Sequence, residues 1–424
     1  MGSAKQQKRF HYAWVIFAVS FLSLFTSLGF CSSPKSLFLA AITENLNIPR
    51  SLFSIGNSFR FITTAVINLF FGKLVAKFGP RKLIAAGFIC LTLSNLIGAA
   101  SNTVFGFYVS NVFLGLGLAW TTTSLVGIVV EKWFTSSKGT IMGFILAANG
   151  LGGAISSQIL SRIIYAEAEG WRTAYLIAAA IMVAVGLIIV LLMRNKPEDV
   201  NTHALGDGSV SKKKQRGREW VGIDTKEAFR KPYFYVCLIC VFLTGMILQS
   251  ASGVASAHMR DQGISTEAIA NAMSIGSLVL MVSKMSTGVC FDRFGLRVTM
   301  IFCDVCAVAA IAMLAFVNSS TTAIVFKVID SMGLPLETIM LPLIAKECFG
   351  QKSFAVLMGI MVSINTLGYS VGSPLMNLVY DITGTYSDGL IFMSCFMVVV
   401  AVAMQFVITA AHKERVRVEA ELML

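Results

Sequence analysis

Ionisable side chains within apolar stretches are the residues of this chain that could do chemistry. Four are basic and two are acidic: Lys35, Arg60, Lys284, Lys327, Asp330 and Glu337. A charge at the centre of a bilayer costs about 2.5–3.5 kcal/mol on insertion scales, so such residues usually face a cavity and mark function. A cation there can pair with an anionic ligand, and an acid there can carry a proton.

Three of the cations are expected at different depths in the membrane. Lys284 lies eight residues before Asp292, about 12 Å along a helix and near mid-membrane. We predict that it binds substrate, with a structural ion pair as the alternative. Arg60 lies roughly 14 Å into its helix, where substrate contact and helix packing are equally favoured. Lys35 follows Pro34 near the end of an apolar run, either as an outer gate or as a side chain snorkelling to the headgroups.

The remaining ionisable residues share one apolar run. Lys327 precedes Asp330 by three residues, and this spacing favours a mutually neutralising pair. Glu337 lies between Pro335 and Pro342, where broken helix geometry often lines a cavity. Burial disfavours the charged form of a carboxylate, which suits a proton carrier. We therefore name Glu337 and Asp330 as candidates for proton coupling, with an ion pair to a neighbouring helix as the alternative for Glu337.

Uncharged polar and aromatic residues at similar depth could hydrogen-bond a carboxylate or hydroxyl. The residues expected at this depth are Asn57, Thr121 and five that we name as candidates for substrate binding: Trp120, Asn149, Gln249, Asn365 and Tyr369. Each could equally hold two helices together, a contact worth about 1 kcal/mol.

Composition predicts that these residues are positioned by membrane helices. The chain has 424 residues, of which 56% are hydrophobic and only 13% are charged, and its mean hydropathy is +0.75. A soluble protein carries about 25% charged residues, which argues against a soluble enzyme. A span needs roughly 20 apolar residues, and about a dozen such runs are present. We expect an all-α membrane protein with about twelve transmembrane helices.

The net charge of +12 is explained by topology rather than by nucleic-acid binding. If the odd-numbered spans run outward from the cytoplasm, 26 of the 34 Lys and Arg residues lie in cytoplasmic segments, which fits the positive-inside rule. We predict that both termini are cytoplasmic, in a plasma or inner cell membrane. The hydrophilic segment 194–231 includes the basic run Lys212–Arg218 and is expected to be a lipid-attracted linker. It would join six-helix bundles at 1–193 and 232–424.

A ten-residue segment occurs twice, at 72–81 and 288–297. Two glycines and an arginine recur at an offset of 216: Gly72, Gly79, Arg81 and Gly288, Gly295, Arg297. The same offset superposes Asn149 on Asn365. Parallel six-span halves that carry such repeats are an architecture of secondary transporters.

The repeated segments are expected at tight cytoplasmic turns, where Gly79 and Gly295 permit the turn conformation. In the second copy, Asp292, Arg293 and Arg297 can form a charge network that locks helix ends in one conformation and releases them in another. We expect the nearby Asp304 to belong to this network. The first copy has Ala76 in the position of Asp292, so gating ion pairs are expected mainly from the second copy.

These loops resemble the signature of the major facilitator superfamily, and the resemblance covers essentially the whole chain. Within that family, Gly29–Leu37 and Tyr380–Tyr386 resemble segments of the monocarboxylate porters. Lys284 falls where these porters and the oxalate–formate antiporters carry an arginine, which implies a cation facing a substrate carboxylate. The sequence departs from both groups, since Asn365 replaces the antiporters' second lysine and Leu280 replaces the porters' aspartate.

The resemblance and the buried cations together predict a secondary transporter that moves a small organic anion, a monocarboxylate, by alternating access. Its expected partners are that anion, protons or a counter-anion, and membrane lipids; we expect a monomer with no cofactor, no metal and no nucleic acid. Two alternatives stay open. One is a proton-coupled multidrug or other small-solute transporter, although Asn111 stands where proton-linked members usually carry arginine. The other is a transporter-like nutrient sensor.

Overall fold

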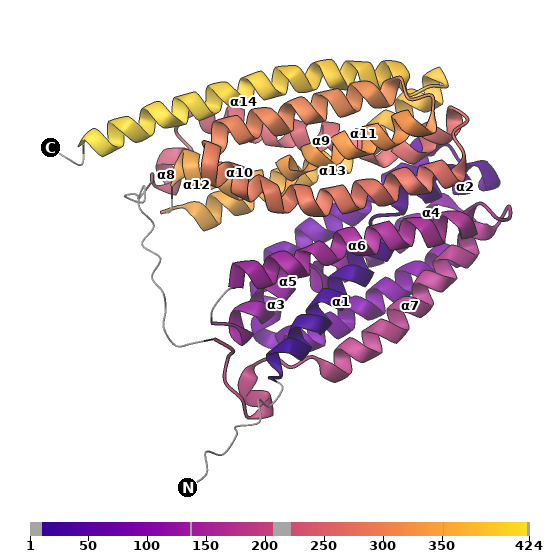
Figure 1. The fold of residues 1–424 in the computed structure, drawn as a ribbon, viewed down its shortest axis with the longest axis horizontal. Coiled ribbons are helices and arrows are strands. Elements are labelled where there is room, and N and C mark those ends of the chain that lie inside the picture. Colours follow the sequence, from indigo (N-terminus) through magenta and orange to yellow (C-terminus); the bar gives the residue numbers. More distant parts are fainter. Residues whose placement is uncertain (1–10, 136–137, 207–221, 351, 422–424) are drawn as a thin grey trace, which may run out of the picture.

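The computed structural model describes residues 11–135, 138–206, 222–350 and 352–421, which form helices and short connections. One group of helices packs in the lower part of Figure 1: α1 (Ala13–Cys31), α2 (Lys35–Leu46), α3 (Arg50–Ala100), α4 (Val104–Thr121), α5 (Thr123–Trp133), α6 (Lys138–Ile164) and α7 (Gly170–Leu192). The second group packs above it: α9 (Pro232–Asp261), α10 (Thr266–Ala315), α11 (Ser320–Gly333), η2 (Leu334–Glu337), α12 (Met340–Phe349), α13 (Phe354–Thr383) and α14 (Ser387–Glu421).

The two groups are called here the first and second bundles. Between them along the chain lie the short helices η1 (Pro197–Val200) and α8 (Thr225–Ala228). The predicted basic run Lys212–Arg218 lies outside the described residues.

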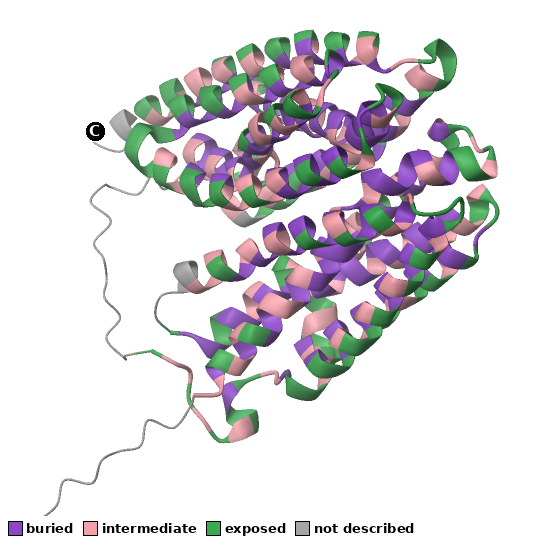
Figure 2. Cartoon of the chain, turned by 45° about the vertical axis from the view of Figure 1, so that its right-hand side comes forward, coloured by how far each residue is buried: buried purple, intermediate pink, exposed green. Residues whose placement is uncertain are grey.

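The helices are long and apolar enough to cross a membrane, where only internally bonded backbone is stable. Within the described residues, nine helices meet this standard, or ten if the bent pair Ser320–Glu337 and Met340–Phe349 is one span. Large apolar side chains remain exposed on outer helices, with Leu191 at 65% and Phe406 at 70%. Figure 2 shows exposed residues along the outward faces of these helices and buried residues facing inward. The fold is the predicted all-α membrane fold.

Two helices are too long to be single spans. Helices α3 and α10 contain 51 and 50 residues, about 75 Å at 1.5 Å per residue, more than twice the hydrocarbon thickness of a bilayer. Each is interrupted by a glycine in the left-handed region, Gly79 at φ 75° and Gly295 at φ 77°. Dividing both helices at these glycines brings the ten spans to twelve. The two breaks lie at equivalent positions of the sequence repeat, and a residue with a Cβ would be strained at either.

Among the described residues, the polar contacts between the bundles gather toward one end of their interface. Ser274 donates to the backbone oxygen of Ala154, and Gln158 donates to Asn271 at 2.7 Å. Close helix approach in the first bundle depends on small residues, since a Cβ on Gly29 would come within 2.5 Å of the Gly152 Cα.

We call the end that carries Arg50 the Arg50 end, and the opposite end, with Gly79 and Gly295, the linker end.

Candidate functional site

A cavity of about 270 Å³ lies between the two bundles. The first bundle lines it with residues of α2, α3 and α4 together with the α1–α2 connection, and the second with residues of α9, α10, α11, η2 and α13. Because both bundles contribute to its walls, a relative movement of the bundles would open or close it. This is the geometry expected of a substrate site in a protein with two moving halves.

The wall formed by the first bundle carries two cations. Lys35 donates from Nζ to the Asn111 side-chain oxygen at 2.8 Å. The Arg60 side chain is buried, with its guanidinium 4.2 Å from the Phe61 ring centre and one nitrogen 3.4 Å from the Ser32 hydroxyl. Its Nε has no hydrogen-bond partner in the described structure. No acidic side chain of the described residues pairs with either cation, so this wall is electropositive and unsatisfied.

The wall formed by the second bundle carries ionisable groups that neutralise one another. Lys327 and Asp330 form an ion pair at 2.7 Å on α11, as the three-residue spacing predicted. Glu337 lies in η2 after Pro335, lines the cavity, and has one carboxylate oxygen without a hydrogen-bond partner. It interacts electrostatically with Lys284 and Asp330. Two lysines and two acids are therefore grouped on this side.

Lys284 is not part of the cavity wall. On α10 the lining residues are Met273, Gly276, Ser277 and Leu280, and Lys284 continues the same helical face one turn closer to the linker end. It interacts electrostatically with Glu337, and no hydrogen bond or ion pair joins the two side chains in the described part of the chain. In this conformation the cations that line the cavity are Arg60, Lys35 and Lys327, whereas Lys284 lies outside the lining set, and substrate binding by Lys284 stays a prediction.

Of the uncharged residues expected at this depth, Asn57 and Gln249 line the cavity. Asn149 accepts a hydrogen bond from Ser33 at 3.5 Å, and Asn365 donates to the backbone oxygen of Val241 at 3.1 Å. These two asparagines join neighbouring helices of their own bundles, which was their alternative role. The half-buried Trp120 has an indole nitrogen without a partner and lies outside the lining set.

Tyr369 connects the bundles beside the cavity. Its ring lies 5.2 Å from that of Phe61, and its hydroxyl donates to the backbone oxygen of Glu337 at 3.4 Å. Tyr369 therefore contacts Phe61, against which the Arg60 guanidinium packs, and the backbone of Glu337, whose carboxylate lines the cavity. Tyr369 does not line the cavity in this conformation, and the predicted substrate contact stays a prediction.

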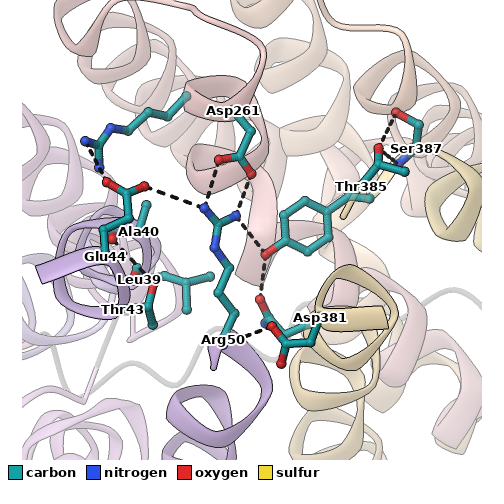
Figure 3. A network of polar contacts seen from close by, with 12 residues as sticks. Leu39, Ala40, Thr43, Glu44, Arg50, Asp261, Asp381, Thr385 and Ser387 are labelled. Atoms are coloured by element: carbon teal, nitrogen blue, oxygen red, sulfur yellow. Dashed lines mark hydrogen bonds and ion pairs between the residues drawn. The ribbon is translucent and has the colours of Figure 1, made fainter. Parts of the chain in front are cut away.

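A network of ion pairs closes the Arg50 end (Figure 3). The guanidinium of Arg50 donates to Asp261 of the second bundle, at 2.5 and 2.8 Å. The backbone nitrogens of Arg50 and Ser51 donate to the Asp381 carboxylate at 3.1 and 2.9 Å. Glu44 pairs with Arg260 at 2.9 Å. These contacts tie α2 and α3 to α9 and α13, so the cavity is shut on this side.

Tyr386 strengthens the network from the α13–α14 connection. Arg50 donates to its hydroxyl at 3.2 Å, and that hydroxyl donates to the Asn377 side-chain oxygen at 2.7 Å. Burial raises the pKa of the Tyr386 phenol, which keeps it protonated as a donor. The residues of this network were missed as a site from the sequence. Two features of the sequence could have indicated this network: Pro49 and Arg50, where a helix begins, and the Tyr380–Tyr386 segment.

The repeated segments at the linker end are open in this conformation. Asp292, Arg293 and Arg297 are exposed and, within the described residues, have no ion-pair partner. In the first bundle, Arg81 is bound, since its Nε donates to the backbone oxygen of Val190 at 2.8 Å. The predicted charge network of the second copy is therefore unformed here.

The other residues predicted for this segment also make few contacts. A Cβ added to Gly72 or Gly288 would meet nothing within 4 Å. Asp304, expected in the charge network, instead lines a groove between α10 and α14.

Comparison with known proteins supports this architecture. The sequence model described as "Major Facilitator Superfamily" matches residues 14–345 and 237–422. The structure is similar to that of the nucleoside transporter NupG, with a TM-score of 0.73, 14% identity and coverage of 95% of this chain and 100% of the other. At that identity the likeness shows the fold.

Curated relatives include transporters of several substrates. The chain is 22% identical to human monocarboxylate transporter 2, over 95% of this chain and 86% of the relative. It is 25% identical to the sialic acid transporter NanX of Escherichia coli, over 56% and 55% of the two lengths. It is 29% identical to the uncharacterised transporter YcxA of Bacillus subtilis, over 42% and 45%. The matches to NanX and YcxA thus span about half of those proteins.

The family match covers almost the whole chain, and the helical fold with its long apolar helices agrees with it. The chain belongs to the major facilitator superfamily, a family of multi-pass membrane transporters rather than of enzymes.

Proposed function

We propose that this transporter moves a small organic anion, a monocarboxylate, through the cavity between the two bundles. The observation that carries the proposal is the pair of cations on the first wall. Arg60 and Lys35 line one cavity of about 270 Å³ and have no acidic partner among the described residues. Buried charges are normally paired, so two adjacent unpaired cations favour a ligand that supplies the negative charge.

The size and chemistry of the site favour a small anion with one carboxylate. A guanidinium can bind a carboxylate through two parallel hydrogen bonds, and the ammonium of Lys35 adds a third donor. On the opposite wall, Gln249 can hydrogen-bond a hydroxyl or carbonyl group of the same ligand. Because Lys327 is already neutralised by Asp330, the second wall offers no free cation for a second carboxylate of the ligand.

Glu337 is proposed as the coupling residue. Its carboxylate lines the cavity, interacts with Lys284, and has an unpartnered oxygen. Protonation of Glu337 would leave Lys284 uncompensated, so that an entering anion would be attracted toward this wall as well. If the transporter instead exchanges anions, a second anion would neutralise the cations of the first wall during the return step. The Asp330 carboxylate, also named for coupling, is engaged by Lys327.

The proposed cycle is alternating access between the bundles 1–193 and 232–424, joined by the segment 194–231. The excess of basic residues at the linker end favours a cytoplasmic position for this end and for both termini. The structure would then be the inward-facing state, with the Arg50 network closing the outer side. We propose a monomer in a plasma or inner cell membrane.

The proposal is tested by uptake of radiolabelled lactate, pyruvate and formate into proteoliposomes. Arg60→Gln is expected to lower uptake of the transported acid by about 100-fold, which corresponds to about 2.7 kcal/mol. The control is Arg162→Gln, an exposed cation of the same bundle outside the cavity, which should keep wild-type uptake. Monodisperse gel filtration of both variants shows that they are folded. Uptake by Arg60→Gln equal to that of the control would refute the proposal.

A further inference from the structure

The walls of the central cavity are more polar than binding of one carboxylate requires. Seven serines line the cavity, from both bundles, together with five large apolar side chains. Small-molecule sites are usually lined mainly by hydrophobic and aromatic side chains, with a few polar groups that fix the orientation of the ligand. The composition of these walls therefore favours a ligand that carries polar groups along its whole length.

Two side-chain amides lie on opposite walls of the cavity without partners. Asn57 on α3 belongs to the first bundle, and Gln249 on α9 belongs to the second. Both side chains are half-buried, and neither has a hydrogen-bond partner among the described residues. Their polar atoms are not enclosed by protein, so a ligand can reach them. Each amide offers two N–H donors and one acceptor oxygen, so a ligand between the walls meets donors and acceptors on both sides.

Two half-buried serines add acceptors where the bundles meet. Ser33 donates to the Asn149 side-chain oxygen at 3.5 Å, and Ser277 donates to the backbone oxygen of Met273 at 3.0 Å. The two hydroxyls converge at Gly153, where a Cβ would lie 3.0 Å from the Ser33 Oγ and 2.9 Å from the Ser277 Oγ. A serine hydroxyl that donates its hydrogen keeps its lone pairs, so both oxygens can accept from a hydroxyl group of the ligand.

The volume of the cavity sets the size of the ligand. About 270 Å³ holds roughly nine water molecules at about 30 Å³ each. Lactate, with about six non-hydrogen atoms, would leave room for several of these waters, whereas a molecule of about twelve covalently bonded atoms would fill the space. An alkyl chain of that length would also fit, but it would remove the amides of Asn57 and Gln249 from water without replacing their hydrogen bonds, which is unfavourable.

We propose that the substrate is a sugar acid, a monocarboxylate of about five or six carbons with several hydroxyl groups. This inference rests on the proposed function, since Arg60 and Lys35 hold the carboxylate. The hydroxyl groups of the chain then exchange hydrogen bonds with Asn57, Gln249 and the serine oxygens. These contacts distinguish the substrate from a fatty acid of equal length.

The test is isothermal titration of the purified full chain with five probes: gluconate, glucuronate, hexanoate, lactate and sorbitol. The sugar acid that binds better should bind at least about tenfold more tightly than hexanoate or lactate. Sorbitol has the hydroxyl groups without the carboxylate and should bind about 100-fold more weakly than that sugar acid.

Gln249→Leu should lower the affinity for the sugar acid about tenfold and leave the affinity for hexanoate within about twofold, because only the hydroxylated ligand loses a hydrogen bond. Asn57→Leu should have the same selective effect from the opposite wall, and it gives an independent test if Gln249→Leu fails to fold. The matched control is Gln262→Leu, at an exposed position just after α9 and outside the lining set, which should bind both acids like wild type.

Hexanoate or lactate that binds as tightly as the better sugar acid, with an affinity that falls in Arg60→Gln, would overturn this inference and leave the proposed function standing. Equal losses for the sugar acid and hexanoate in Gln249→Leu would also overturn it, because the amide would then have a structural role. Sugar-acid binding that is undiminished in Arg60→Gln would contradict the proposed function and this inference together.

Discussion

The two walls of the central cavity carry similar side chains in opposite electrostatic states. On the first wall, Arg60 and Lys35 have no acidic partner among the described residues and contact the neutral side chains of Ser32 and Asn111. On the second, Lys327 is held by Asp330 at 2.7 Å, and Glu337 interacts electrostatically with Lys284, which lies one turn beyond the wall. A buried cation therefore indicates a binding site only when its partner is missing. The first wall is arranged to receive an anion, and the second to stay neutral without one.

Breaking the pair on the second wall should have the largest effect. Asp330→Asn leaves the Lys327 ammonium buried without its partner, and the loss of one member of a buried pair costs about 3–5 kcal/mol. We expect a large fall in the melting temperature of the purified protein. Replacing both residues, Lys327→Met with Asp330→Leu, should restore most of the stability because no charge is left uncompensated. An unchanged melting temperature in Asp330→Asn would show that the two walls do not differ in this way.

Removing the Glu337 carboxylate tests whether this residue carries the coupling proton on the second wall. If Glu337 carries a proton, wild-type uptake should rise as the pH on the substrate side falls, since the protonated form is the one that accompanies the anion. Glu337→Gln is fixed in a neutral form and should give a flat pH profile, with uptake about tenfold lower than wild type at acidic pH. Uptake is measured at several external pH values under a constant anion gradient.

Two other pH profiles of uptake would distinguish anion exchange, or coupling through another group, from proton coupling through Glu337. A flat profile in the wild type, with uptake that requires an internal anion, would establish exchange instead of proton symport. A pH dependence that persists unchanged in Glu337→Gln would assign the coupling proton to another group.

We expect the smallest change from a substitution at the Arg50 end, where the ion-pair network joins the two bundles. Arg50→Gln removes the ion pair to Asp261 and should favour the conformation open at this end by about fivefold, or about 1 kcal/mol. The measurement is the labelling rate of Leu39→Cys, a buried cavity-lining position, by an impermeant thiol reagent in a background without accessible cysteines. Arg172→Gln is the control, because Arg172 bonds only within the first bundle at the same end. Equal rates in both variants would contradict a latching role.

Much of this arrangement could be predicted from local sequence. Apolar run lengths predict the helices, and the repeat at an offset of 216 predicts the glycine breaks at Gly79 and Gly295. The Lys327–Asp330 pair also follows from spacing on one helix. Each of these features depends on residues close in the chain or on an internal repeat.

The remaining features depend on tertiary packing. Arg50 meets Asp261, a residue 211 positions away, and spacing alone cannot show such a contact. For Lys284, the depth follows from the spacing to Asp292, yet the lining set of the cavity ends one turn earlier, at Leu280. The residues that line the cavity come from eight helices and one connection, so its extent is a property of the packed bundles. The unpaired state of Arg60 likewise becomes visible only when every neighbour is in place.

The central claim is that the unpaired cations of the first wall bind the anion. Its most direct test is isothermal titration of a transported monocarboxylate into wild-type protein, Arg60→Gln and Lys284→Gln. We predict that Arg60→Gln weakens the affinity by at least about tenfold, whereas Lys284→Gln stays within about threefold of wild type. Loss of binding in Lys284→Gln with wild-type affinity in Arg60→Gln would contradict the account.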